Sequence, residues 1–246
     1  MRDFEDSTLW RVSGFERGQY QGARAGYTGQ RVSSLLPAAL QAELTALGRE
    51  RSCGDALEVL AALRRQRENA LVYLACERLV WPVTVFPTEM VCHSPHDLGE
   101  ASAAALRSLR ALSVEPSGVL PPGAWAGEPD EVLASYRPLA PALWRMALHG
   151  PRRRILGALR GAVAYRLLHS IRDDGCTVPA SMRAALERVG RRPVSLGELA
   201  AVPGMNLEQA ARLLNALYLV SNLMVTRASP AARREPLFAF LRWPSG

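Results

Sequence analysis

A segment rich in proline and glycine interrupts this chain, and it limits the possible fold more than any other feature. Residues 116–130 contain four prolines and three glycines. Proline fixes φ and lacks an N–H donor, and an ordered glycine loses much backbone entropy, so neither a helix nor a strand continues through such a stretch. We therefore predict a linker over 116–136 with a folded part on each side.

The two parts carry opposite charge. Residues 1–136 hold 13 arginines against 17 acidic residues, whereas residues 137–246 hold 17 arginines against six acidic residues. The second part is therefore strongly basic, with a net charge of +11 inside a chain whose total is +7. Such a surplus attracts polyanions, which indicates nucleic acid or an acidic protein as partner.

Several enzyme classes are excluded because the sequence contains no lysine. A P-loop needs lysine on the phosphates, a protein kinase needs its strand lysine, and a pyridoxal enzyme needs a Schiff-base lysine. The sequence also lacks G-x-G-x-x-G, G-x-S-x-G and H-E-x-x-H. We expect a non-enzymatic protein without a cofactor.

The best candidate for catalysis or metal binding is the segment 92–97, with Cys92, His93, His96 and Asp97. Neighbouring residues of a strand point to opposite faces, so Cys92 and His93 would not converge on one metal ion. We predict a structural cysteine and turn-capping side chains here. A metal site at Cys92, His93 and His96 stays open as an alternative.

The sequence before the linker alternates between helical and strand patterns, and the fold class that we predict is α+β. Leucines at helical spacing favour a helix over 35–47, and Asp55 is placed to cap a second one. An antiparallel meander is expected over 71–93, followed by a helix from Asp97 to about Arg110 and a strand over 111–115. Residues 1–115 loosely resemble small sensor and docking domains of bacterial signalling proteins, which implies an input or protein-interaction role.

Residues 137–176 are expected to form a helical connector. One helix is predicted around 139–147, and another from Pro151 to Ile171, where Gly157 and Gly161 would allow close helix packing. The run Arg152, Arg153 and Arg154 would occupy its first turn. These arginines either contact phosphates or are simply solvated, and they oppose the helix dipole.

Two helix starts are well marked in the last quarter of the chain. Ser195 and Glu198 have the spacing of a capping box, and Pro203-Gly204 ends the short helix that they begin. Asn206 and Gln209 then mark a longer helix. Two strand patterns follow, at Leu223–Thr226 and Pro236–Leu241.

This order of elements resembles a winged helix-turn-helix domain over about residues 177–242. We place the limits of the whole domain at residues 177 and 246. In that family the second helix of the pair enters the DNA major groove and the wing touches phosphates. The resemblance implies that one set of residues approaches base edges and another lies near phosphates. The first set is Asn206, Gln209, Arg212 and Asn215, and the second is Arg227, Arg233 and Arg234.

Some residues of the reading helix depart from the family pattern. Arg212 is its single arginine, Glu208 would repel phosphates, and Leu213 and Leu219 would be apolar residues facing outward. Two hypotheses therefore remain: a bacterial DNA-binding transcriptional regulator with an amino-terminal input domain, or a signalling adaptor whose winged helix binds an acidic protein.

A cytoplasmic location without membrane contact is expected. No apolar run reaches the roughly 18–20 residues that span a bilayer, and the first residues are acidic rather than basic and apolar. The four cysteines form no C-x-x-C pair, which suits a reducing compartment.

Overall fold

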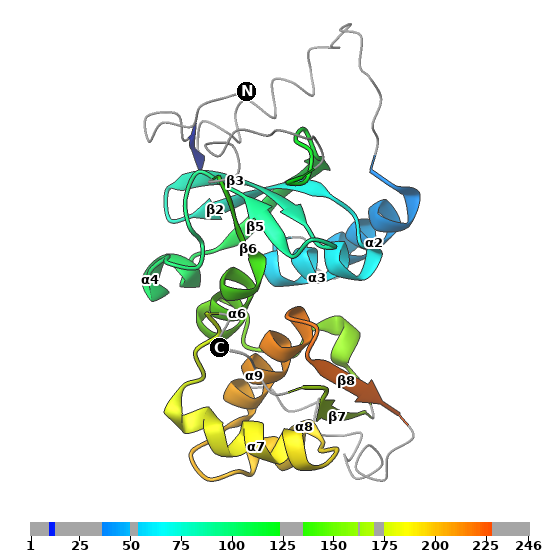
Figure 1. Ribbon diagram of the computed structural model, residues 1–246, viewed down its shortest axis with the longest axis vertical. Helices are drawn as coiled ribbons and strands as arrows, with labels where there is room; N and C mark the ends of the chain where they lie inside the picture. The colour runs from blue at the N-terminus through cyan, green and yellow to red at the C-terminus, as the bar shows by residue number, and fades with distance from the viewer. Residues whose placement is uncertain are drawn as a thin grey trace, which may run out of the picture. The chain divides into compact units, whose positions relative to one another are not determined.

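The computed structural model describes residues 10–12, 36–49, 54–123, 135–161, 163–169 and 175–227 (Figure 1). The chain forms two compact units. Unit 1 contains Met1–Ala142 and His149–Pro151, and unit 2 contains Leu143–Leu148 and Arg152–Gly246. Helices and antiparallel strands are combined, so the predicted α+β class is confirmed.

Unit 1 is built around an antiparallel sheet with the strand order β5-β2-β3-β4-β6, and β1 pairs additionally with β3. The expected meander over 71–93 is confirmed as β2, β3 and β4, and the expected strand over 111–115 as β5. The strands are β1 Trp10–Arg11, β2 Ala70–Cys76, β3 Leu79–Phe86, β4 Val91–His93, β5 Arg110–Pro116 and β6 Tyr136–Pro138.

Pro82 lies inside β3 without disturbing the sheet. On one side β3 pairs with β2 along its whole length, with Pro82 opposite Tyr73. On the other side β1 pairs with Leu79 and Val80, and β4 begins only at Thr84. Pro82 therefore falls between these two pairings, where a missing N–H donor does least harm.

Two helices, α2 (Ala38–Arg49) and α3 (Ala56–Gln66), lie along the same side of this sheet (Figure 1). Asp55 caps α3 by accepting hydrogen bonds from the N–H groups of Leu57 and Glu58, as its place in the sequence predicted. Residues 56–63 are all buried, so α3 is covered all round. Arg65 and Gln66 bind Glu43 of α2 and join the two helices.

The helix expected from Asp97 to Arg110 is much shorter than predicted. The carboxylate of Asp97 accepts a hydrogen bond from the N–H of Gly99 at 2.7 Å and forms a local turn. Helix α4 (Ala103–Arg107) starts only after Ser102, whose hydroxyl caps it. The prediction failed because an aspartate can stabilise a turn as well as a helix start.

An aromatic cluster lies at the β4 end of the sheet. The ring centroids of His93 and Tyr136 are 5.2 Å apart, and those of Phe86 and Tyr136 are 5.8 Å apart.

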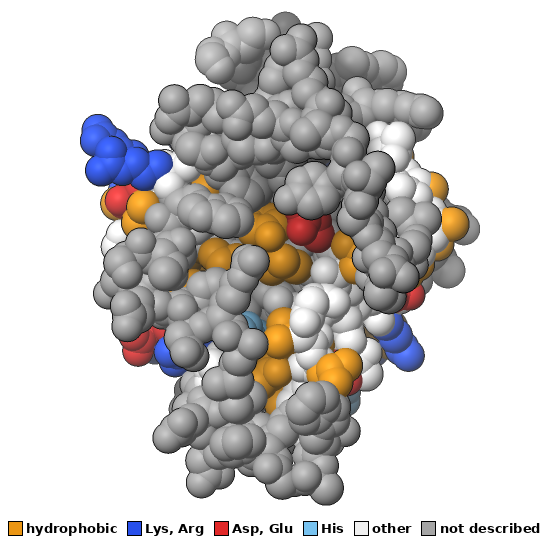
Figure 2. Space-filling view, turned by 90° about the horizontal axis from the view of Figure 1, so that it is seen from above, with side chains coloured by type: hydrophobic (Ala, Val, Ile, Leu, Met, Phe, Trp, Pro, Cys, Tyr) orange, Lys and Arg blue, Asp and Glu red, His pale blue; other side chains and the backbone are white. Residues whose placement is uncertain are grey.

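Seen from above the view of Figure 1, the coloured surface is mainly hydrophobic at its centre, and the arginine side chains stand at its margins (Figure 2). No helix among the described residues is long and apolar enough to cross a membrane.

The expected domain boundary at 116–136 is wrong. β5 ends at Pro116, and β6 returns to the same sheet by pairing with β4, so both ends of this segment belong to unit 1. The division falls instead within α6 (Leu139–His149). Long-range strand pairing held the segment inside one unit, and local composition cannot reveal that. Residues 124–134 lie outside the described part of the chain.

In its described residues, unit 2 contains part of α6, three further helices and a small sheet. The helices are α7 (Arg183–Arg191), preceded by the 3-10 turn η3 (Ala180–Met182), then α8 (Leu196–Ala200) and α9 (Leu207–Leu219). Both predicted capping boxes are confirmed. Strand β7 (Ala164–Leu167) pairs with β8 (Leu223–Thr226) on one side and is bridged to Val194 on the other.

Of the expected helical connector 137–176, the helix predicted around 139–147 is confirmed as α6, whereas the described residues 151–161 and 163–169 do not form the helix expected from Pro151 to Ile171. This stretch holds the 3-10 turn η2 (Gly157–Leu159) and strand β7, which is part of the unit 2 sheet. Gly161 has φ +107°, which a right-handed helix does not allow. Gly157 and Gly161 therefore serve a change of direction rather than close helix packing.

Candidate nucleic-acid interface

The start of α9 is fixed by a reciprocal cap. The N–H of Gln209 donates to Oδ1 of Asn206 at 2.8 Å, and the N–H of Asn206 donates to Oε1 of Gln209 at 3.0 Å. These bonds satisfy backbone donors that the first helical turn would otherwise leave unpaired. Asn206 and Gln209, two of the four predicted base-reading residues, thus use their side-chain oxygens to cap the helix.

Arg212, the third predicted base reader, is directed to the end of another helix. Its Nη1 donates to the carbonyl oxygens of Leu148 at 2.8 Å and Ala147 at 3.3 Å, and its Nε donates to Glu208 at 3.0 Å. The side chain is only 12% exposed. A guanidinium in this place satisfies carbonyls that the last turn of α6 leaves without helical partners.

Asn215, the fourth, lies in the interior with an exposed fraction of 0%. Its Oδ1 accepts the N–H of Leu156 at 2.9 Å, and its Nδ2 donates to the carbonyl of Arg154 at 3.0 Å. Leu213 and Leu219 are 0% exposed as well. The expectation that these residues face outward is therefore wrong.

The reason for this error is that α9 packs on more than one side. The sequence pattern was interpreted as one core face opposite a polar surface, which suits a helix at the edge of a fold. In unit 2, however, the residues buried along α9 surround it: Ala210, Ala211, Leu213, Leu214, Asn215, Ala216, Leu217 and Leu219. Leu207, at the start of the helix, is 37% exposed.

The arginine run before η2 is only partly available to a ligand. Arg152 is 9% exposed, and its guanidinium donates to the carbonyls of Arg154 at 2.9 Å and Ile155 at 2.6 Å. It stabilises a bend, so neither of its predicted roles is correct. Arg153 and Arg154 are exposed, and Arg153 lies 3.9 Å from Glu208.

The predicted wing is described in part. Arg227, directly after β8, is exposed. Arg233, Arg234 and the strand expected at Pro236–Leu241 lie outside the described residues. Within the described residues β8 pairs with β7, which precedes the three helices in the sequence.

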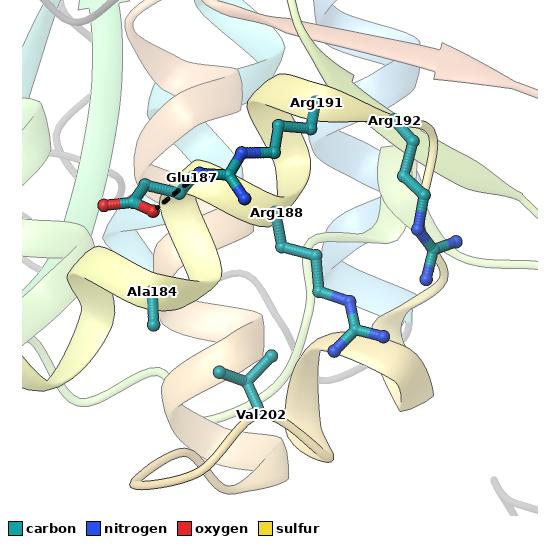
Figure 3. Close-up of a pocket in the computed structure, with 6 residues that line it drawn as sticks. All are labelled: Ala184, Glu187, Arg188, Arg191, Arg192 and Val202. Atoms are coloured by element: carbon teal, nitrogen blue, oxygen red, sulfur yellow. Dashed lines mark hydrogen bonds and ion pairs between the residues drawn. The ribbon is translucent and has the colours of Figure 1, made fainter.

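A basic groove that the sequence analysis did not identify lies along α7 (Figure 3). It has a volume of about 490 Å³. Arg188 and Arg192 extend from the α7 side toward α8, whereas Arg191 turns back and binds Glu187 at 3.3 Å. The residues that line it are Ala184, Glu187, Arg188, Arg191, Arg192 and Val202.

One carboxylate is held at the edge of this groove. Glu198 accepts a hydrogen bond from Arg192 at 3.2 Å and another from the N–H of Ser195 at 3.0 Å. Burial raises the pKa of Glu198, but the Ser195 bond and the charges of Arg192 and Arg188 outweigh it, so the pKa is lowered. Glu198 is therefore ionised at neutral pH and partly neutralises the groove.

The sequence did contain a signal for this groove. Arg188 and Arg192 are four residues apart, as are Glu187 and Arg191, whereas Ala185 and Val189, also four residues apart, are the buried positions of α7. This spacing places charged side chains on the solvent side of α7.

The segment around Cys92 has the chemistry of a packed core. Cys92 lies opposite Val85 and Arg137, and His93 lies opposite Thr84 and Tyr136, so their side chains leave the sheet on different faces. Burial, with Asp97 adding and Arg137 opposing, raises the pKa of the Cys92 thiol to about 12. Burial also lowers the pKa of His93. Among the described residues, no three histidine, cysteine or acidic side chains are grouped to hold a metal ion.

Comparison with protein-family models, curated proteins and solved structures finds no match to this chain.

Proposed function

We propose that this chain is a non-enzymatic regulatory protein of bacteria whose basic carboxy-terminal unit binds DNA. The acidic amino-terminal unit would receive a signal or a partner. A cytoplasmic location fits this function, because bacterial chromosomal DNA is in the cytoplasm.

The observation that carries this proposal is the exposure of the arginines in unit 2. Among the described arginines of unit 2, Arg145 and Arg212 are half-buried and Arg152 is buried. All the other described arginines of this unit are exposed to solvent. Such a set attracts a polyanion, and those arginines that contact phosphates add affinity by releasing condensed counterions. The exposed residues are Arg153, Arg154, Arg160, Arg166, Arg183, Arg188, Arg191, Arg192 and Arg227.

The order of elements in unit 2 gives further support. A helix, a short capped helix, a turn and a longer capped helix are followed by β8, as in the winged helix-turn-helix family that the sequence resembles. The small sheet of Val194, β7 and β8 is consistent with this comparison and supports the proposal. Its middle strand comes from before α7, which differs from the pattern expected from the sequence.

The adaptor hypothesis loses one of its two supports. It depended on Leu213 and Leu219 as an apolar docking surface, and both are buried. Its other support, the sparse set of donors around Arg212, remains, because Arg212 is bound to the carbonyls of α6. An acidic partner could still be attracted by the same arginines, so the two hypotheses must be separated by experiment.

The proposal is tested by binding of the full chain to a random-sequence duplex, measured by fluorescence anisotropy between 50 and 300 mM salt, about the range where such binding weakens steeply. We expect log Kd to change linearly with log salt, because phosphate contacts release counterions. Poly-glutamate at equal charge serves as the control ligand. Binding to poly-glutamate without binding to DNA would contradict the proposal and favour an adaptor.

A further inference from the structure

We infer that the DNA contact of this protein lies in the groove along α7, where Arg188 and Arg192 bind backbone phosphates, and that α9 does not read base sequence. The inference rests on the proposed function and deepens it. It names the ligand chemistry as the phosphate backbone of duplex DNA, which is independent of sequence.

The first step is that α9 offers little to a base edge. Reading a base requires a side chain with free donors or acceptors that can enter the major groove. Asn215 is fully buried, and Arg212 is bound to the end of α6. Asn206 and Gln209 are committed through their oxygens to the helix cap.

The second step is the geometry of the groove itself. Arg188 lies on the last turn of α7 and Arg192 is the extended residue that directly follows this helix, and both reach toward α8 in Figure 3. Between them and Val202 the space is open and has a volume of about 490 Å³. Guanidinium groups form paired hydrogen bonds with phosphate oxygens, so two of them on one side of a groove suit a backbone phosphate.

The third step concerns the ion pairs at the groove, of which Arg191–Glu187 is weak enough to be exchanged. The side chains of Arg191 and Glu187 are 80% and 66% exposed, and exposed pairs of this kind contribute little to stability. Arg192 is bound to Glu198, which is the more firmly held partner because it also caps α8. Glu198 therefore limits the affinity of the groove for an anion.

The test compares full-length variants of equal charge. One variant is R188A/R192A, and its matched control is R160A/R166A, which removes two exposed arginines outside the groove lining. Anisotropy titrations use two duplexes of the same length and unrelated sequence across a salt series. Thermal unfolding of each variant verifies that it is folded.

We expect wild type to bind both duplexes with the same affinity within about threefold, since phosphate contacts carry no sequence information. In R188A/R192A the slope of log Kd against log salt should be smaller by about two, because each lost phosphate contact removes about 0.9 from it. R160A/R166A should change it by less than about half as much. Equal loss in both variants, or no loss in R188A/R192A, would overturn the inference while leaving DNA binding intact.

A second variant tests the groove by gain of binding. E198Q keeps a side chain that can complete the capping box but removes the negative charge beside Arg192. We expect E198Q to bind DNA about two- to fivefold more tightly at low salt, because the phosphate no longer competes with a carboxylate. Unchanged or weaker binding would count against the groove. If wild type binds neither duplex, the proposed function itself fails.

Discussion

Asn215 connects α9 to the loop before η2 through both ends of its side-chain amide. Changing it to leucine keeps a similar size but leaves the N–H of Leu156 without this acceptor, whereas the carbonyl of Arg154 keeps its hydrogen bond from Arg152. Because an unpaired buried polar group costs about 1–3 kcal/mol, we expect Asn215→Leu to lower the free energy of unfolding by about that amount. Urea denaturation measures this change, and a loss below about 0.5 kcal/mol would contradict the assigned role.

Cys92 gives a pH dependence of stability. Its thiol has a folded pKa of about 12, against an ordinary value of 9.0. The folded state keeps its proton where the unfolded chain loses it, so this contribution is complete below pH 9 and declines as pH rises toward 12. Between pH 8 and pH 10 the stability advantage of wild type over Cys92→Ala should shrink by about 1.4 kcal/mol.

The comparison with Cys92→Ala removes the effect of tyrosines, which titrate in the same range in both proteins. Guanidinium chloride unfolding at the two pH values provides the measurement. A difference between the proteins that stays constant would show that the thiol is not shielded as its 2% exposed fraction indicates.

At the scale of elements, the helix caps give the sharpest expectation. Asn206→Ala removes the acceptor of the Gln209 N–H and should lower the free energy of unfolding by about 1 kcal/mol. Asn206→Asp keeps an acceptor at the same place and should be nearly neutral. Chemical denaturation of both variants tests this, and equal losses would mean that the cap does not stabilise α9.

These caps also show which parts of the fold a sequence can predict. The side chains of Asp55, Ser195 and Asn206 accept hydrogen bonds from N–H groups at most three residues further along the chain. Such caps can therefore be predicted from a short stretch of sequence. The α2–α3 pair and the meander were likewise predicted, since their signals are periodic or turn-based.

Elements that depend on distant neighbours were not predicted. β7 is a strand because it pairs with β8, nearly sixty residues later, and its sequence alone suggested a helix. β6 belongs to unit 1 because it pairs with β4 across the proline-rich segment. The base-reading role of α9 was predicted from the polar residues on one face of the helix. Asn215, the last of these residues, is buried because it binds Arg154, which lies much earlier in the sequence.

At the scale of the whole molecule, the charge division is the property that links fold to function. The basic surplus after residue 136 falls largely within unit 2, and much of it is exposed there. A uniform surplus would attract DNA over the entire surface, whereas a groove concentrates the contact on a few arginines. The location of the protected arginines therefore tests the account more directly than affinity does.

The decisive measurement is arginine modification by phenylglyoxal, read by peptide mass spectrometry on the full chain with and without a saturating random-sequence duplex. We expect Arg188 and Arg192 to react in the free protein and to be protected by DNA, with Arg160 and Arg166 reactive in both states. Arg212 should react slowly throughout, because its side chain is 12% exposed. Protection of Arg160 and Arg166 with Arg188 and Arg192 still reactive would contradict the account.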